Sequence, residues 1–466
     1  MKIIIERLLQ KEKVMGEKVL VAGAGKSGVS AAKLLLARGG KVLLYDGNDK
    51  LDAAELKKNF NGSSDISVKL GELKKEDIVG IDLCVISPGI DLETPFVKLL
   101  RENGVQIWSE IELAYTVAKG KLIAITGTNG KTTTTALTGE IMKNHFGKMN
   151  SFTVGNIGLP YTETAVLTTD ESVTTLEASS FQLETIHDFH PHVSAILNIT
   201  PDHMNRHHTM DRYVGIKEKI TENQTEDDFC VLNYDDKILN AFGKRGECAA
   251  VPVFFSSTQK LDSGFDLEGD VICKVDRGQV TPIIRTNELK LLGKHNYENV
   301  MAAMAMSFCM GVPLSVIRKT CMEFQPVEHR IEFVAEKNGV KYYNDSKGTN
   351  PDAAIQAIRA MPGETILIGG GYDKGSSYDE WINAFDHKVR YLVLIGQTRD
   401  AISDCARKHG FTNIMFAEDM QEAVKVCASY AEPGNFVLLS PACASWDMFS
   451  NYEERGRKFK EYVRAL

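Results

Sequence analysis

The sequence has no long apolar run, no basic tract and no cysteine framework. None of its apolar runs reaches about 18 residues, so no membrane span is expected. Its formal net charge is −8, and Lys and Arg form no stripe, so nucleic acid is not expected as a partner. The nine cysteines include no Cys-x-x-Cys pair, which indicates a reducing compartment such as the cytoplasm. Residues 1–16 become charged too soon for a signal-peptide core and are predicted to form a charged extension.

Length and pattern bound the architecture. A chain of 466 residues predicts roughly three domains. Short apolar runs alternate with helical patterns along the whole chain, as in successive βαβ units. We therefore predict an α/β fold with a Rossmann-like domain at 1–119, a central P-loop-type ATPase domain at 120–325 and a Rossmann-like C-terminal domain at 326–466.

The stretch Leu122–Thr133 is the most informative in the chain. Its apolar start predicts a buried strand that leads through glycines into a helix. Glycines let backbone N–H groups turn toward phosphate oxygens, and the helix N-terminus adds partial positive charge. Ile125 stands where the general pattern has its first glycine, so a plain glycine turn is the alternative. The residues predicted to bind ATP here are Gly127, Thr128, Asn129, Gly130, Lys131, Thr132 and Thr133.

The first domain opens with a second glycine pattern. The strand Lys18–Ala22 runs into Gly23–Gly28, and the next strand closes with Asp46. Such a G-x-G-x-x-G pattern with an acid after the second strand is typical of a dinucleotide site. A nucleotide-type fold that uses these glycines for close packing or for another phosphate ligand fits equally, and the pattern alone does not decide.

Two polar residues of the central domain follow apolar strands. Glu177 ends one strand, and His203 comes after another. In a domain with a phosphate loop, a carboxylate at the carboxyl end of a strand suits a Mg²⁺ ligand. A solvated surface glutamate and a histidine in a structural hydrogen bond are the alternatives.

Helices supply further candidates in the same domain. An apolar helix is predicted over 300–310, with Asn296 as its cap. Lys217 lies in a helix predicted near 213–221, and composition alone does not separate it from Lys219. A solvated helix face is the alternative for both lysines.

Cations and hydroxyls gather at predicted strand ends of the third domain. They occur at His329-Arg330, in 344–350, at Asp373-Lys374 and in Ser440–Ser445. Fixed cations with hydroxyls suit a carboxylate substrate or a developing phosphate charge.

Taken together, these motifs resemble the Mur ligase family over residues of about 20 to 460. The motifs at 344–349 and 440–445 resemble the branch of the family that adds D-glutamate. Members that add a diamino acid carry an Asp-Asn-Pro-Arg-like motif, whereas Gly370–Lys374 stands in the comparable region here. The matching stretches are 127–132, 155–158, 176–184, 202–204, 295–299, 344–349 and 440–445.

The resemblance implies an ATP-dependent amide-bond ligase of cytoplasmic peptidoglycan precursor synthesis. Its substrates would be UDP-N-acetylmuramoyl-L-alanine and D-glutamate, joined through an acyl phosphate. The resemblance also implies a monomer with no membrane or nucleic-acid partner. The first domain would then hold the UDP-sugar through positions matching Ser27, Asp46, Asn48 and Gly89.

The resemblance assigns roles residue by residue. Thr132, Glu177, His203 and Lys217 match metal ligands for two Mg²⁺ ions, and Lys217 matches a lysine carbamylated to N6-carboxylysine. The predicted catalytic residues are Lys131, Glu177, His203 and Lys217. Asn296, Asn299, Arg330 and Asp345 match positions that contact ATP. The remaining substrate-binding positions are Asn156, Lys347, Thr349, Lys374, Ser445 and Tyr452, where Tyr452 replaces a common Phe.

Three other functions compete with this interpretation. A folylpolyglutamate-synthase-like ligase shares the Gly-Thr-Asn-Gly-Lys motif but gives no reason for a Rossmann-like domain before it. An NAD-dependent dehydrogenase would explain Gly23–Gly28 and Asp46 but not Lys131. A non-catalytic nucleotide-binding protein leaves Lys217 and Lys374 without roles.

Overall fold

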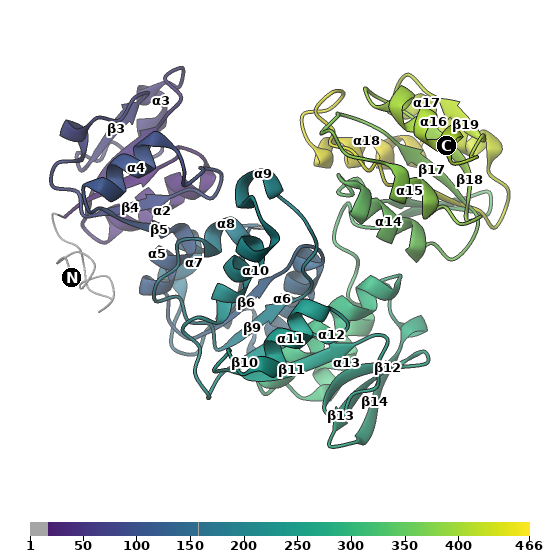
Figure 1. Ribbon diagram of the computed structural model, residues 1–466, viewed down its shortest axis with the longest axis horizontal. Helices are drawn as coiled ribbons and strands as arrows, with labels where there is room; N and C mark the ends of the chain where they lie inside the picture. Colours follow the sequence, from purple (N-terminus) through teal and green to yellow (C-terminus); the bar gives the residue numbers. More distant parts are fainter. Residues whose placement is uncertain (1–16, 157) are drawn as a thin grey trace. The chain divides into compact units, whose positions relative to one another are not determined.

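The computed structural model describes residues 17–156 and 158–466, and the predicted charged extension 1–16 lies outside them (Figure 1). Three α/β sheets confirm the predicted fold class. The chain forms two compact units. The first holds residues up to Ile284 with Glu298–Cys321, and the second holds Arg285–Tyr297 with Met322–Leu466. Among the described residues, every helix is too short or too polar to cross a bilayer.

The first sheet is a parallel one of five strands, drawn as arrows in Figure 1, in the order β3-β2-β1-β4-β5. Its strands read as apolar runs because helices cover both faces of such a sheet. The strands are β1 Lys18–Ala22, β2 Lys41–Asp46, β3 Ile66–Leu70, β4 Leu83–Ile86 and β5 Gln106–Ser109. The helices are α2 Lys26–Ala37, α3 Ala53–Lys58, α4 Pro95–Glu102 and α5 Glu110–Val117.

The central sheet has nine strands in the order β14-β13-β12-β11-β10-β9-β6-β8-β7. Strands β6 to β11 run parallel, and β12 pairs antiparallel with β13. The strands are β6 Lys121–Thr126, β7 Ser151–Gly155, β8 Val173–Glu177, β9 Val193–Ile196, β10 Phe229–Asn233, β11 Val251–Ser256, β12 Gly264–Glu268, β13 Val271–Asp276 and β14 Gln279–Arg285. The helices are α6 Lys131–Phe146, α7 Tyr161–Thr164, α8 Ser180–Leu183, α9 Met204–His207, α10 Met210–Glu218, α11 Lys237–Arg245, α12 Lys294–Cys309 and α13 Leu314–Glu323.

The start of α12 corrects one prediction. The helix begins at Lys294, so Asn296 lies inside its first turn and does not cap it. The side-chain Nδ2 of Asn296 donates to Leu292 O at 2.7 Å, and its backbone N–H donates to Gly293 O at 2.9 Å. The chain turns at Gly293, which has a φ of +90° that favours glycine.

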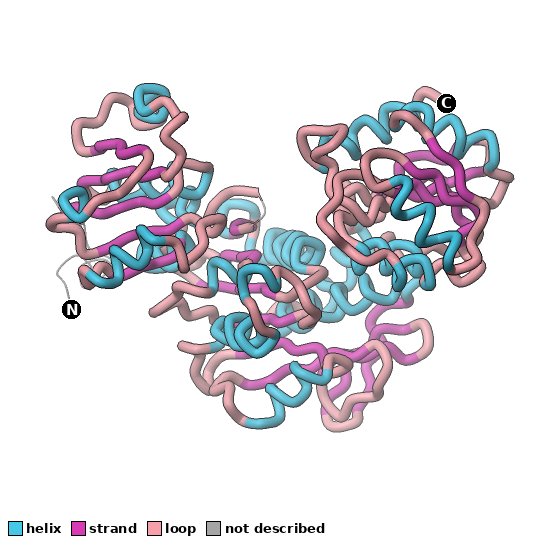
Figure 2. The backbone as a smooth tube through the Cα atoms, turned by 45° about the horizontal axis from the view of Figure 1, so that its top comes forward, coloured by secondary structure: helices cyan, strands magenta, loops and turns pink. Residues whose placement is uncertain are grey.

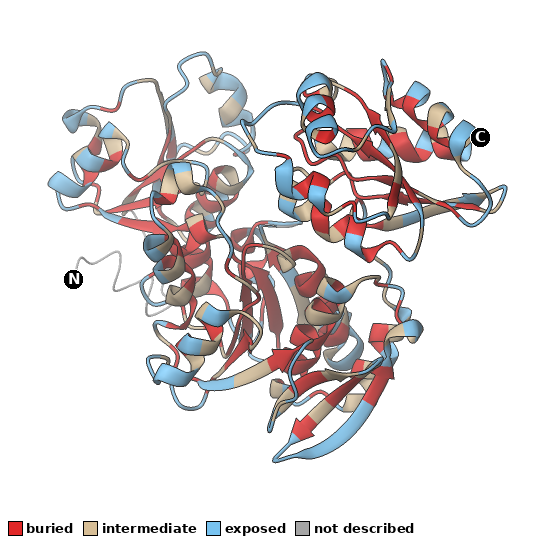
Figure 3. Ribbon diagram, turned by 45° about the vertical axis from the view of Figure 1, so that its right-hand side comes forward, coloured by how far each residue is buried: buried red, intermediate tan, exposed pale blue. Residues whose placement is uncertain are grey.

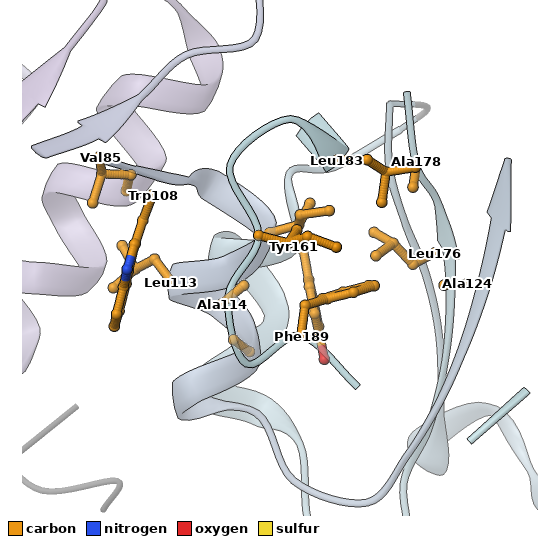
Figure 4. Packing of buried hydrophobic residues seen from close by; sticks show 14 of the residues in the cluster. Val85, Trp108, Leu113, Ala114, Ala124, Tyr161, Leu176, Ala178, Leu183 and Phe189 are labelled. Carbon is orange, nitrogen blue, oxygen red and sulfur yellow. The ribbon is translucent and has the colours of Figure 1, made fainter. Parts of the chain in front are cut away.

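The first and central sheets share one hydrophobic core. Buried residues of β4, β5, α5, α7 and β8 pack together with Phe189 of the loop before β9, and Trp108 of β5 and Tyr161 of α7 are among them (Figure 4). Figure 3 shows the buried segments in red. A polar link reinforces this packing, since the buried Glu110 carboxylate accepts the N–H of Thr162 at 2.6 Å and its hydroxyl at 2.7 Å. The core therefore explains why both sheets belong to one compact unit.

The third sheet has six strands in the order β15-β16-β20-β17-β18-β19, shown in magenta in Figure 2. β15 is antiparallel to β16, and the other pairs are parallel. The carboxyl ends of β16, β20 and β17 therefore meet at one edge. The strands are β15 Glu332–Lys337, β16 Val340–Asn344, β17 Thr365–Gly369, β18 Val389–Leu394, β19 Ile414–Phe416 and β20 Phe436–Leu439. The helices are α14 Pro351–Ala360, α15 Asp379–Asn383, α16 Arg399–Lys408, α17 Met420–Tyr430 and α18 Tyr452–Arg464.

Candidate active site

The loop between β6 and α6 has the geometry of a phosphate cradle. Gly127 and Gly130 have φ values of +150° and +84°, which side chains rarely adopt. A Cβ on Gly130 would lie 2.2 Å from Oδ1 of Asn299, so α12 packs directly against the loop. Thr134 donates to the same Oδ1 at 3.3 Å. The predicted residues 127–133 and Asn299 are thus brought together in the first unit.

Two lysines converge on this loop. Lys131 Nζ donates to Gly127 O at 2.7 Å and to Thr128 O at 2.8 Å. Lys217 is 1% exposed on α10, and its Nζ donates to Gly127 O at 2.9 Å. Burial lowers the pKa of Lys217 well below its usual value, and the nearby charge of Lys131 lowers this pKa further. The structure therefore separates Lys217 from its neighbour Lys219, which is only half-buried.

Glu177 faces this loop from the end of the neighbouring strand β8. Its carboxylate is 1% exposed, and Oε1 accepts the side-chain amide of Asn156 at 2.9 Å. Oε2 is buried without a hydrogen-bond partner among the described residues. An unpaired buried carboxylate oxygen is costly unless a cation binds it. A carboxylate such as Glu177 and a hydroxyl such as that of Thr132 are oxygen ligands of the kind that Mg²⁺ takes, so these residues fit the ion.

His203 lies at the N-terminus of α9 with a φ of +54°. The centre of its ring lies 5.0 Å from the centre of the Phe181 ring. Its Nε2 lies 3.5 Å from Oδ2 of Asp202. Its side chain is half exposed, so the imidazole is accessible for a ligand. The predicted residue is therefore at the surface beside Phe181 of α8, the helix that follows β8 and its last residue Glu177.

Arg206 is a residue that sequence reasoning missed. It lies one turn after His203, and its guanidinium donates to Pro88 O at 3.0 Å and to Glu184 at 2.6 Å. The same group lies 4.1 Å from the centre of the Phe181 ring. It ties α9 to the Pro88-Gly89 turn of the first domain, and no sequence signal beyond its spacing from His203 indicates this.

The predicted UDP-sugar residues surround the carboxyl ends of β1, β2 and β4. Asp46 accepts the backbone N–H of Ala24 at 2.8 Å through Oδ2 and that of Asn48 at 3.0 Å through Oδ1. Ser27 lies in the first turn of α2, and Gly89 follows β4. A Cβ on Gly28 would lie 1.7 Å from Gly23 O, so that glycine serves close packing of α2 on the loop.

In the second unit, three loops meet at the carboxyl ends of β16, β17 and β20. Lys347 Nζ lies 5.5 Å from the centre of the Tyr452 ring, and Thr349 follows two residues later. Tyr372 N donates to Ala444 O at 2.9 Å, which joins the loop of Lys374 to the loop of Ser445. Lys374 Nζ lies 5.5 Å from the centre of the exposed Trp446 ring.

Arg455 holds two of these loops and was also missed. It is 1% exposed on α18 and donates through Nη2 to Ser346 O at 2.8 Å and through Nη1 to Cys443 O at 3.1 Å and Ala444 O at 3.0 Å. A charged, polar helix sequence gives no sign of such burial. Arg455 therefore positions the loops of Lys347 and Ser445.

Asp345 and Arg330 lie together in the second unit with the half-buried His295. Burial raises the pKa of Asp345 to about 7, although Ser440 Oγ donates to Oδ2 at 2.7 Å. The Arg330 charge lowers this pKa and also that of His295, which burial already lowers to about 4. Arg330 Nε is buried without a hydrogen-bond partner among the described residues. An unpaired buried donor of this kind suits an anionic ligand.

These features define an α/β protein with a phosphate-binding loop and a separate loop cluster rich in cations and hydroxyls. The Mur ligase middle domain model matches residues 125–307, the glutamate ligase domain model matches 329–443, and the MurD-like N-terminal domain model matches 17–109. Together the three models cover most of the chain in the order of its sheets.

Curated relatives agree over nearly the whole length. The UDP-N-acetylmuramoylalanine–D-glutamate ligase of Lachnoclostridium phytofermentans is 52% identical over 97% of this chain and 99% of its own length. The enzyme of that name from Clostridioides difficile is 44% identical over 97% and 99%. The chain belongs to the Mur ligase family.

Solved structures show the same fold. The UDP-N-acetylmuramate-alanine ligase MurC from Thermotoga maritima covers 96% of this chain and 99% of its own, with 20% identity and a TM-score of 0.59. The MurF ligase from Thermotoga maritima in complex with ADP covers 100% of both chains, with 17% identity and a TM-score of 0.59. At these identities the likeness concerns the fold alone.

Proposed function

We propose that this chain is an ATP-dependent ligase that adds D-glutamate to UDP-N-acetylmuramoyl-L-alanine and forms ADP, in cytoplasmic peptidoglycan precursor synthesis. The observation that carries the proposal is 52% identity, over 97% of the chain, to a ligase named for this reaction. The absence of the diamino-acid motif and the presence of Gly370–Lys374 agree with a D-glutamate acceptor.

Three domains divide the work in this proposal. The domain 1–119 holds the uridine and pyrophosphate through Ser27, Asp46, Asn48 and Gly89. The domain 120–325 binds ATP, and the domain 326–466 binds the acceptor. We propose that the enzyme acts as a monomer.

Phosphoryl transfer takes place at the loop between β6 and α6. Lys131 leaves its loop carbonyls and moves to the terminal phosphates, where its charge stabilises the transferring group. Backbone N–H groups of 127–133 and the start of α6 hold the remaining phosphate charge. Asn156 orients the substrate carboxylate, which attacks the γ-phosphate in line and becomes an acyl phosphate. Thr132, Glu177 and His203 would hold Mg²⁺, which would neutralise phosphate charge during the transfer.

Lys217 acts as N6-carboxylysine in this proposal. Only an unprotonated amine reacts with CO₂, and the lowered pKa of Lys217 favours that form. The reaction joins the amine nitrogen to the carbon of CO₂ and releases one proton. The product is an anionic carbamate, whose two oxygens would serve as ligands for a second Mg²⁺ ion. The support is therefore the burial of the amine beside Lys131 and the phosphate loop.

The acceptor binds at the loop cluster of the second unit. Lys347, Thr349, Lys374 and Ser445 offer two cations and two hydroxyls for the two carboxylates of D-glutamate, with Tyr452 at the rim. The free amine attacks the acyl carbon, and the tetrahedral intermediate loses phosphate. Asn296, Asn299, Arg330 and Asp345 contact ATP.

One experiment separates this function from its alternatives. Phosphate release from ATP is measured with UDP-N-acetylmuramoyl-L-alanine, with and without D-glutamate. Release that depends on both substrates is expected. A dehydrogenase or a binding module releases no phosphate under any condition, and a folylpolyglutamate-synthase-like ligase releases it only with a folate and glutamate.

A further inference from the structure

Three side chains of unlike chemistry meet between α15 and α16 in the second unit. Cys405 and His409 stand four residues apart at the end of α16, a spacing that places them on one face of a helix. Asp379 is the first residue of α15. Cys405 is half-buried and the other two are exposed, so water and ions reach the group.

The three side chains already face one another. Asp379 Oδ1 accepts from His409 Nε2 at 2.8 Å and from Cys405 Sγ at 3.7 Å. One ligand atom from each residue lies within 4.8 Å of the other two. Ser377 Oγ donates to the second oxygen, Oδ2, at 2.6 Å. That hydrogen bond orients the carboxylate and leaves Oδ1 directed at the cysteine and the histidine.

We propose that Asp379, Cys405 and His409 bind one Zn²⁺ ion, with water as the fourth ligand. Thiolate, imidazole and carboxylate are the ligands that zinc takes in proteins. Bond lengths of about 2.0–2.3 Å place tetrahedral ligand atoms about 3.5 Å apart. The sulfur–oxygen distance of 3.7 Å already agrees with this spacing, and the nitrogen–oxygen distance of 2.8 Å needs to open by less than about 1 Å.

Binding exchanges a proton for the ion. The Cys405 thiol loses its proton to the solvent as the sulfur–zinc bond forms. His409 binds through Nε2, so the proton that this nitrogen donates to Asp379 leaves to the solvent and Nδ1 carries the one remaining ring proton. The hydrogen bond between the two residues is then replaced by one bond from each of them to the ion. The ion then joins the start of α15 to the end of α16.

Helix electrostatics alone explain part of the group. An acid at a helix start and a histidine at a helix end are both favourable without any metal. They do not explain a thiol directed at the same carboxylate oxygen, nor the serine that holds the other oxygen. The competing outcome is therefore an Asp379–His409 ion pair that binds no zinc, and it is the one that the experiment must separate.

The test uses the untagged full-length chain, stripped of metal and kept in excess Mg²⁺ with ADP so that sites for hard cations are filled. Co²⁺ is the probe, because a thiolate ligand gives it a charge-transfer absorption band. One Co²⁺ per chain with this band is expected, and Zn²⁺ should displace it. The variant Cys405→Ser should abolish the band and weaken Zn²⁺ binding about 100-fold, since even partners outside the ligand shell change affinity about 10–100-fold.

Matched variants make the result specific. Ser377→Ala should weaken Zn²⁺ binding about 10-fold by releasing the carboxylate. Cys309→Ser and His145→Gln, which remove another half-buried thiol and another exposed imidazole, should leave it unchanged. A wild-type chain without the band, or a band that Cys405→Ser retains, would overturn the proposal. Circular dichroism checks that each variant is folded.

Discussion

Lys217→Met removes the buried amine while keeping a side chain of similar length. Lys217 is 1% exposed, and its Nζ donates to Gly127 O at 2.9 Å. Gly127 O also accepts Lys131 at 2.7 Å, so the substitution leaves that carbonyl with a partner. The variant therefore tests the chemistry of the amine rather than the packing of α10.

The structure predicts opposite effects on stability and on activity. The substitution loses the hydrogen bonds of Lys217 Nζ to Gly127 O at 2.9 Å and to Thr126 Oγ1 at 3.5 Å, each worth about 0.5–1.5 kcal/mol for an uncharged amine. It also removes the cost of burying this polar nitrogen, about 1–3 kcal/mol, beside the charge of Lys131. The free energy of unfolding of ligand-free Lys217→Met should therefore equal or exceed that of the wild type. Its turnover should fall by about 10²–10³-fold, because a charged group at the phosphoryl centre is missing.

The assay combines denaturant unfolding with acceptor-dependent phosphate release. Acetate should partly restore turnover of Lys217→Met by filling the vacated oxygen site, and ¹³C-bicarbonate should give a carbamate signal in the wild type only. Lys219→Met, two residues along the same segment, is the control and should remain active. Full turnover of unrescued Lys217→Met, or an equal loss in Lys219→Met, would refute the reasoning.

Three further substitutions have definite expected results. Lys131→Ala should lose about 3 kcal/mol of transition-state stabilisation in kcat while Lys143→Ala on the same helix stays active; near-normal kcat in folded Lys131→Ala would contradict the phosphate-loop role. Lys374→Ala should raise KM for D-glutamate tens-fold, since a hydrogen bond to a charged group is worth about 1.5–3 kcal/mol, with little change for ATP; exposed Lys425→Ala is the control, and an unchanged KM would count against the assignment. Folding raises the pKa of Asp345 to about 7. Its contribution to the free energy of unfolding is therefore full below a pH of about 4 and is lost as the pH rises to about 7, a loss of up to about 4 kcal/mol. The variant Asp345→Asn should abolish this pH dependence. If the free energies of unfolding of the wild type and Asp345→Asn change in parallel across that pH range, the role given to Asp345 is wrong.

The strands could be predicted from the sequence because parallel strands are continuous apolar runs, and the loop between β6 and α6 could be predicted from its glycines. The predicted strand Lys18–Ala22 and the structure's β1 have the same bounds. Side chains after such strands collect at one sheet edge, which is why Glu177 and the Lys131 loop could be placed near each other. The start of α12 was wrong because Asn296 has a typical capping side chain that here lies within the first turn.

Long-range polar contacts could not be predicted. Arg455 bonds to Ser346, which is 109 residues away in sequence, and its charged neighbours on α18 suggest a solvated helix. Glu112 accepts the backbone N–H groups of His187, Asp188 and Phe189 from the central domain, yet a glutamate in a helix gives no such signal. From the sequence, only the family resemblance distinguished Lys217 from Lys219. In the structure, the two lysines also differ in burial, because Lys217 is buried and Lys219 is half-buried.

The two sets of residues differ in what fixes them. The residues proposed to act on the substrates follow strand ends and glycines, since Lys131 begins α6 directly after its loop and Lys374 lies in the loop after β17. The two missed arginines join segments that are far apart in sequence. Arg206 bonds to one backbone carbonyl and one carboxylate, and Arg455 bonds to backbone carbonyls in the loops of Lys347 and Ser445. A planar guanidinium can bridge two loops at once, which a lysine cannot do with one ammonium. The residues proposed to act on the substrates can therefore be recognised from the local sequence. The residues that position loops can be recognised only from contacts that the folded chain creates.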